Sequence, residues 1–174
     1  MIRKFSLVCL LFLGFVILPG CASQTETPAV KNDFDYARKL IRTNQAECVL
    51  MKDGKILKVE RGRGVSPLLR LYDREKESMQ GAVVVDKVIG RAAAAIAICG
   101  KARHVHGQIM SDDAVTFLKA NGISSSRDLG VARILNRKRD GLCPLEQSVE
   151  GIDDPQKALQ SLRKKIAILA GGKR

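Results

Sequence analysis

The stretch GAVVVDKVIGRAAAAIAICG, residues 81–100, constrains the fold more than any other part of this chain. It contains Val83–Val85, a short and wholly apolar run that is typical of a strand inside a covered sheet. The alanine-rich remainder predicts a helix from Asp86 to Cys99, with Gly100 as its C-cap. A strand that turns directly into a helix favours an α/β fold in which helices join parallel strands.

The other segments predict the neighbours of this strand and helix. Helices are predicted at Asp33–Thr43, Ser66–Gly81, Ser111–Asn121 and Pro155–Ala170. Strands are predicted within Cys48–Glu60 and at Arg103–Ile109. The pattern of residues 123–135 is ambiguous, and residues 136–146 are loop-like. Asp53-Gly54, between two apolar runs, predicts a hairpin. We expect Ser66, Ser111 and Asp154 to cap helices. This order predicts a three-layer α/β fold, with a mixed, mostly parallel sheet and helices on both faces.

The first residues of the chain predict export. Arg3 and Lys4 precede an apolar run, Phe5 to Leu18, which is shorter than the about 20 residues that span a membrane. The following LPGC resembles the lipobox of bacterial lipoproteins. In that family the cysteine, here Cys21, is acylated, for example with palmitate, and begins the mature chain. An uncleaved N-terminal anchor is the alternative.

These patterns divide the chain into four parts. We expect a signal peptide at residues 1–20, an acylated cysteine and polar tether at 21–32, a folded domain at 33–147 and a C-terminal helical extension at 148–174. The protein would be exported and lipid-anchored to the cell envelope. Ala22, rather than an aspartate, follows the cysteine, which favours the outer membrane if the host has two.

The composition narrows the class of partner. The chain has 30 Lys and Arg against 18 Asp and Glu, and its net charge is +12. A basic surface is attracted to an anionic membrane by about 1 kcal/mol per basic residue near it. Because of the export signal, and because Trp is absent and aromatics make up 4% of the chain, we expect no nucleic acid. An envelope protein partner and a basic face without a specific partner remain alternatives.

Three cysteines follow Cys21, namely Cys48, Cys99 and Cys143. Their number is odd and no spacing repeats, so the sequence predicts no disulfide framework, although an oxidising compartment would permit one bond.

Five stretches carry a resemblance to a known family: KDGK, GVSPLLRLY, GAVVVDKVIGRAAA, GQIMSDDA and RDGLCPLE. In this order, between Phe34 and Gln147, they resemble an uncharacterised prokaryotic domain-of-unknown-function family with the cytidine-deaminase-like fold. Residues 148–174 lie outside this resemblance, which implies the α/β fold described above.

The resemblance also poses a test for zinc. Zinc deaminases have two motifs. A His or Cys, with a Glu two residues later, stands at the start of the helix after the third strand, and Pro-Cys-x-x-Cys stands at the start of the next helix. We expect these places at residues 86–88 and 110–113, and neither holds a His or Cys. His104 and His106 share a strand face and could begin a metal site, but no third ligand is evident. We therefore expect no metal, no cofactor and no zinc-dependent deamination.

The expected start of this helix is a candidate ligand site. Asp86 would cap the helix, Lys87 and Arg91 would add two cations on one side, and Gly90 would allow close approach to the backbone. Free N–H donors, a positive dipole end and cations favour an anion. Ser111 begins the neighbouring parallel helix and would open on the same edge of the sheet. An exposed lysine with no ligand is the alternative for Lys87.

The resemblance implies that Cys143 and Glu146 fold back to this edge. Cys143 would be a nucleophile only if a cation or helix start favoured its thiolate, and otherwise it is a structural cysteine. Three hypotheses follow. The domain binds a small anionic or nucleotide-like ligand without deamination; or it is a metal-independent enzyme that uses Lys87, Asp86 and Cys143; or it is a structural or interaction lipoprotein of the envelope.

The last predicted helix is amphipathic. Its apolar stripe consists of Leu159, Leu162, Ile166 and Leu169, and its cations are Lys157, Arg163, Lys164 and Lys165. We expect the stripe to dock on the domain's own sheet layer or on a partner, while the cations face anionic lipid or another acidic surface.

Overall fold

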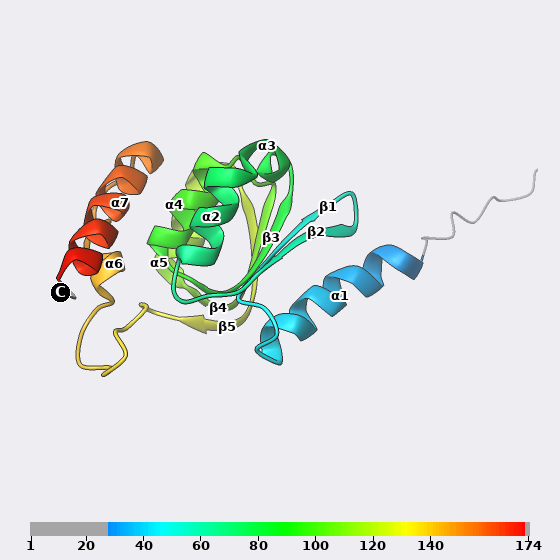
Figure 1. Ribbon diagram of the computed structural model, residues 1–174, viewed down its shortest axis with the longest axis horizontal. Coiled ribbons are helices and arrows are strands. Elements are labelled where there is room, and N and C mark those ends of the chain that lie inside the picture. The colour runs from blue at the N-terminus through cyan, green and yellow to red at the C-terminus, as the bar shows by residue number, and fades with distance from the viewer. Residues whose placement is uncertain (1–27, 173–174) are drawn as a thin grey trace, which may run out of the picture.

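The computed structural model describes residues 28–172, and they form a five-stranded mixed sheet with helices on both faces (Figure 1). The α/β fold predicted from the order of elements is therefore confirmed. The predicted signal peptide, Cys21 and the first part of the tether lie outside the described residues.

The strands are β1 (Cys48–Lys52), β2 (Lys55–Glu60), β3 (Val83–Ile89), β4 (His104–Ser111) and β5 (Ser124–Val131). The helices are α1 (Pro28–Arg42), α2 (Ser66–Arg74), α3 (Lys76–Met79), α4 (Arg91–Cys99), α5 (Asp112–Ala120), α6 (Pro144–Gln147) and α7 (Pro155–Gly171). No helix among residues 28–172 is both long enough and apolar enough to cross a bilayer.

The sheet has the strand order β2-β1-β3-β4-β5. Strand β1 is antiparallel to both of its neighbours, whereas β3, β4 and β5 run parallel to one another. Asp53 and Gly54 join β1 to β2 with φ angles of 51° and 75°. Positive φ at both central residues is the turn geometry that Asp-Gly favours in hairpins, so the predicted hairpin is confirmed.

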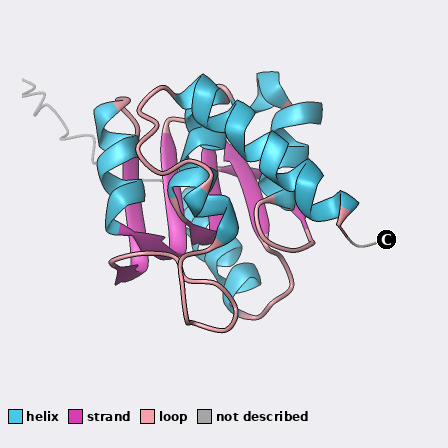
Figure 2. Ribbon diagram, turned by 90° about the vertical axis from the view of Figure 1, so that its left-hand side faces the viewer, coloured by secondary structure: helices cyan, strands magenta, loops and turns pink. Residues whose placement is uncertain are grey.

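The two faces of the sheet are covered unequally. Helix α1 packs Ala37, Leu40 and Ile41 onto Val49 and Val85 on one face. Helices α2, α4 and α5 cover the other face, and α7 packs on the outside of α4. Figure 2 views the molecule from this more heavily covered side, with the helices in front of the strands.

Helix α4 is the centre of the larger core. Every residue from Arg91 to Ala97 is buried, and alanines occupy most of these positions. Small side chains let α4 fit among the sheet, α2, α5 and α7. Most of the predicted stripe of α7 docks on this helix rather than on the sheet itself, because Leu159 and Leu162 are buried in the same core and Ile166 packs against it. Leu169, the last residue of the stripe, is exposed.

The boundary between β3 and α4 differs from the prediction. Strand β3 continues to Ile89, and α4 begins at Arg91 after Gly90, so the prediction that Asp86 caps a helix is wrong. The β-branched residues Val88 and Ile89 extend the ladder by pairing with β4.

Other boundaries also differ. Ser66 is the first residue of α2 rather than its cap, and the segment after Arg74 forms the separate helix α3. Helix α1 begins at Pro28, inside the predicted tether. The ambiguous residues 123–135 contain strand β5.

Two predicted caps are confirmed. The Ser111 Oγ accepts a hydrogen bond from the Ala114 backbone N–H at 3.2 Å, at the start of α5. The Asp154 carboxylate accepts from the N–H groups of Gln156 and Lys157, at the start of α7. These side chains satisfy donors that the first turn of a helix leaves unpaired.

Candidate ligand pocket at the starts of two helices

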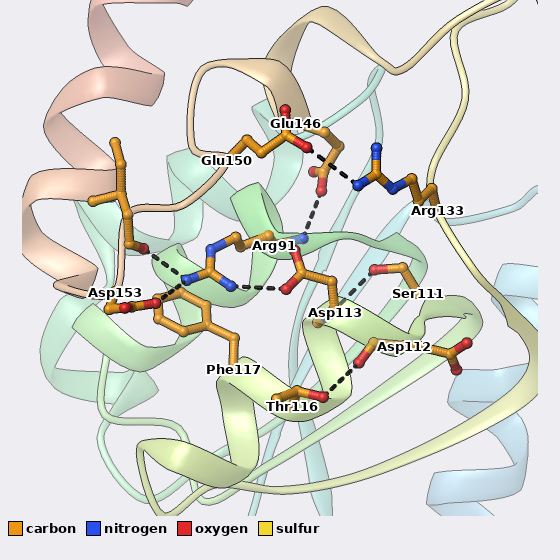
Figure 3. Close-up of polar contacts among 12 residues, drawn as sticks. Arg91, Ser111, Asp112, Asp113, Thr116, Phe117, Arg133, Glu146, Glu150 and Asp153 are labelled. Carbon is orange, nitrogen blue, oxygen red and sulfur yellow. Dashed lines mark hydrogen bonds and ion pairs between the residues drawn. The ribbon is translucent and has the colours of Figure 1, made fainter.

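Helices α4 and α5 begin side by side, beyond the carboxyl ends of the parallel strands β3 and β4 (Figure 3). The segment after β5, residues 132–153, covers both helix starts and carries α6. Ligands of open α/β sheets bind at this edge. The arrangement therefore makes a three-walled site from segments far apart in the sequence.

Glu146 caps helix α4 from a distance of more than fifty residues along the chain. Its carboxylate accepts hydrogen bonds from the backbone N–H of Arg91 at 2.7 Å and of Ala92 at 3.1 Å. Gly90 makes this approach possible, because a Cβ at this position would overlap the Glu146 carboxylate. The positive end of α4 is thus occupied by a carboxylate of the chain itself, whereas the sequence predicted an anionic ligand at the helix start.

The guanidinium of Arg91 ties three segments together. It donates to Asp113 of α5 at 2.8 Å, to the Ile152 carbonyl at 2.9 Å and to Asp153 at 2.7 Å. It also stacks over the Phe117 ring, 4.1 Å from its centre. The Arg91 side chain is 9% exposed, so this cation is engaged inside the protein.

The start of α5 and the segment after β5 line a pocket of about 190 Å³ beside the start of α4. The lining residues are Ser111, Asp113, Arg133, Ile134, Leu142, Glu146 and Glu150. Three of them are acids and one is basic, and that one, Arg133, lies 3.3 Å from the carboxylate of Glu150. The pocket is therefore acidic, although the protein as a whole is basic.

The charge of Glu146 depends on its surroundings. Burial raises the pKa of its carboxyl above the usual range, and the nearby Asp113 raises it further. The two helix N–H groups and the charge of Arg91 act in the opposite direction. Glu146 can therefore gain a proton more readily than an exposed glutamate, and its two oxygens still face the helix donors.

Four predicted ligand residues, Gly90, Arg91, Ser111 and Glu146, come together at this edge, and Ser111 and Glu146 line the pocket. Lys87 is placed elsewhere, because its Nζ contacts Asn44 at 2.7 Å and Glu47 at 3.2 Å, near the end of α1.

Asp86 lies within the sheet. It pairs in register with Cys48 of β1 and accepts a hydrogen bond from the Val88 N–H at 3.0 Å. Burial raises the pKa of Asp86 to about 7. Asp86 and Lys87 therefore do not form the predicted site at a helix start.

Cys143 also lies outside the pocket. It precedes α6 and lines a separate hollow with Leu135, Pro144 and Leu169. The metal-independent enzyme hypothesis requires Cys143 to lie together with Asp86 and Lys87. The described part of the chain does not bring these three residues together. The thiols of Cys48, Cys99 and Cys143 are free.

Sequence reasoning missed Asp113, Arg133 and Glu150 as pocket residues. Asp113 belongs to a quoted motif, and its position in the first turn of a predicted helix was a usable signal. Arg133 lies in the segment of ambiguous pattern, and Glu150 follows α6, so no local periodicity indicated that they face each other.

The residues at the two helix starts do not fit a zinc site. Gly90, Arg91 and Ala92 begin α4, and residues 111–114 offer only a hydroxyl and two carboxylates. Within residues 28–172, no group of three or more His, Cys, Asp or Glu side chains is arranged to hold a metal ion. The ring nitrogens of His104 contact Ser124 and Ser126 at 2.8 and 2.9 Å.

The sheet, its helices and the pocket define an α/β domain with a mixed five-stranded sheet and a covered site at the carboxyl edge. The family described as "Domain of unknown function (DUF1893)" matches residues 36–166, and the chain belongs to this family. The match extends beyond Gln147 and includes most of α7. None of the curated proteins matches this chain.

Several solved structures are similar to this chain, and one of them belongs to the same family. A DUF1893 family protein from Thermotoga maritima is 26% identical, with a TM-score of 0.69 over 78% of this chain and 90% of that one. The Thermotoga maritima diaminohydroxyphosphoribosylaminopyrimidine deaminase/5-amino-6-(5-phosphoribosylamino)uracil reductase is 13% identical, with a TM-score of 0.42 over 69% of this chain and 40% of that enzyme. A guanine deaminase from Nitrosomonas europaea is 12% identical, with a TM-score of 0.38 over 81% and 85%.

Proposed function

We propose that this protein is a lipid-anchored binding domain of the cell envelope, with a deaminase-like fold and no zinc. Its pocket at the starts of α4 and α5 holds a small ligand that bears N–H donors or a positive charge. The observation that carries the proposal is the lining of this pocket, in which Asp113, Glu146 and Glu150 are acids and Arg133 is the one basic residue. Arg91, which pairs with Asp113, lies outside this lining.

The lining favours a ligand that is cationic or rich in N–H groups, rather than the anionic ligand expected from the sequence. Carboxylates form their strongest hydrogen bonds with cationic donors, whereas carboxylate oxygens repel an anion that approaches them. An anion would also have to displace Glu146 from the N–H groups of Arg91 and Ala92. A ligand rich in N–H groups can instead bind with the Glu146 cap in place.

The proposed role is binding rather than deamination. Zinc deaminases need a metal-bound water and a glutamate that moves protons. The helix starts here offer no such ligand set among the described residues. The pocket is also smaller than the about 300 Å³ that is usual for drug-sized ligands, which favours a small amine, amidine or aminated ring.

A ligand screen tests the binding proposal. The chain from Ala22 onward contains every described helix and strand and is suitable for thermal-shift measurements. We expect a bound amine or amidine to raise the melting temperature by about 5 °C near saturation. Asp113→Asn and Glu150→Gln should abolish this shift, whereas Asp140→Asn, an exposed acid outside the pocket lining, should keep it.

Two outcomes would overturn the binding proposal. One is a shift caused by carboxylates or phosphates but not by their amine counterparts, which would restore the anionic ligand. The other is release of ammonia from a bound amine at a rate that depends on Glu146, which would make the protein an enzyme.

The anchoring proposal rests on the basic start, the apolar run and LPGC. Expression of Cys21→Ser with a radiolabelled fatty acid tests it. We expect an unprocessed precursor without label, and normal processing and labelling of this variant would contradict the proposal.

A further inference from the structure

A second surface lies where the loop after β5 meets the C-terminal end of α7. Leu135 of the loop and Leu169 of the helix line one hollow, together with Arg137 and Ala170. Leu135 is 50% exposed, Leu169 is 43% exposed and Ile168 is 67% exposed. Three large apolar side chains are thus exposed at neighbouring places, and none of them belongs to the buried core.

Cations flank these apolar side chains. Arg137, Lys138 and Arg139 are consecutive and exposed in the loop. Lys164 and Lys165 precede Ile168 and Leu169 by four residues on α7, so each lysine shares a helix side with one apolar residue. We call these nine residues, Leu135, Arg137–Arg139, Lys164, Lys165 and Ile168–Ala170, the loop–α7 surface.

The charges of the loop–α7 surface are not engaged within the fold. Among residues 28–172, no ion pair includes Arg137, Lys138, Arg139, Lys164 or Lys165. By contrast, Arg163 of the same helix pairs with Asp73. Helix α7 carries no acidic residue, so Lys164 and Lys165 have no acid beside them on the helix.

We propose that the loop–α7 surface docks on an anionic phospholipid membrane. Exposed apolar side chains inserted at the boundary of headgroups and acyl chains, with cations beside them, are the pattern of interfacial membrane binding. The cations supply attraction to anionic headgroups, and the apolar residues supply burial. Single-stranded nucleic acid would favour aromatic side chains for stacking, and the loop–α7 surface contains none.

This docking is separate from the acyl anchor and from the ligand pocket. The loop–α7 surface lies across the sheet from α1, the first described helix (Figure 1). It is a property of the folded domain, so it should persist in a chain that begins at Ala22 and carries no lipid. The test therefore gives an answer even if the acylation of Cys21 or the ligand proposal fails.

Sedimentation with vesicles tests the docking. The chain from Ala22 onward should bind vesicles of phosphatidylcholine with about one quarter phosphatidylglycerol, and binding should weaken as salt rises. Replacing Arg137, Lys138 and Arg139 together by Gln should weaken binding about a hundredfold. Ile168→Ser should weaken it about tenfold, because an inserted apolar side chain is lost.

A matched variant controls for net charge. Lys55, Lys101 and Lys119 are exposed and lie outside the loop–α7 surface, so replacing them by Gln removes the same charge elsewhere. This control should bind at nearly the original strength, and all variants should keep the original melting temperature because the replaced residues are exposed. Equal weakening by both triple variants would overturn the proposal. So would binding to single-stranded RNA, lost in the first triple variant, without any binding to vesicles.

Discussion

The backbone of Gly90 lies so close to the carboxylate of Glu146 that no other residue could occupy this position without moving that carboxylate. The absence of one methyl group allows an acid from the segment after β5 to cap the most buried helix of the domain. Gly90 has an extended backbone, with φ at −103°, so the requirement is one of space and not of backbone conformation.

Gly90→Ala should therefore act through Glu146. We expect the variant to lower the free energy of unfolding by about 1–2 kcal/mol, which is the usual cost of losing a helix cap. In a Glu146→Ala background the same change should cost almost nothing, because the clash is gone. Urea unfolding of the four proteins measures this coupling, and additive effects of the two changes would contradict the cap. Gly171→Ala, where a Cβ meets open space, is the matched control.

Asp86 should make the stability fall as pH rises. Burial raises the pKa of Asp86 from 3.8 to about 7, so the folded state holds a proton that the unfolded state loses near pH 4. Stability from this group is fully present below pH 4 and is lost as pH rises through 7, by about 4 kcal/mol in total. Asp86→Asn should flatten this dependence and stabilise the protein at pH 8. Urea unfolding at pH 5 and pH 8 measures both effects, and an unchanged slope would show that another group is responsible.

Arg91 should hold the connection between α6 and α7 in place. Arg91→Met keeps much of the packing on Phe117 but loses the bonds to Asp113, the Ile152 carbonyl and Asp153. Both acids are at least half exposed and can return to water, so we expect a modest loss of about 2 kcal/mol. Hydrogen exchange should increase in residues 148–154 more than in the sheet. Uniformly faster exchange would indicate global destabilisation instead.

The two sides of α7 should respond differently to the same substitution. Leu162 is completely buried against α4, and Leu162→Asp should cost more than about 4 kcal/mol because it buries a charge. Ile168→Asp changes an exposed residue and should leave the melting temperature within about 2 °C of the original. A large loss from Ile168→Asp would mean that this end of α7 belongs to the core.

Local chemistry was enough to predict much of this fold. Asp53-Gly54 favours a tight hairpin turn, and the turn forms there as predicted. Ser111, followed by two acids, identified the start of α5. The start of α4 was misplaced because Val88 and Ile89 can join a strand or a helix. Their pairing with β4 decides between the two, and this partner is some twenty residues away.

The candidate site was predicted only in part, for a similar reason. Gly90, Arg91 and Ser111 lie near helix starts that the pattern located within a few residues. The family resemblance implied that Glu146 folds back to this edge of the sheet, but its contact with α4 was not predicted, since no periodicity links residues so far apart. The same resemblance implied that Cys143 folds back to this edge as well, but the turn into α6 directs it to another hollow.

The unequal covering of the sheet also has a mechanical consequence. Among the described residues, α1 is the helix on its face of the sheet, and it is the first element of the described chain. Tension applied at its N-terminal end would load the contacts of Ala37, Leu40 and Ile41 with β1 and β3 first. The pocket lies beyond the carboxyl ends of the parallel strands, and the loop–α7 surface lies across the sheet from α1. Force from a tethered N-terminus would thus strain α1 well before it distorted the pocket.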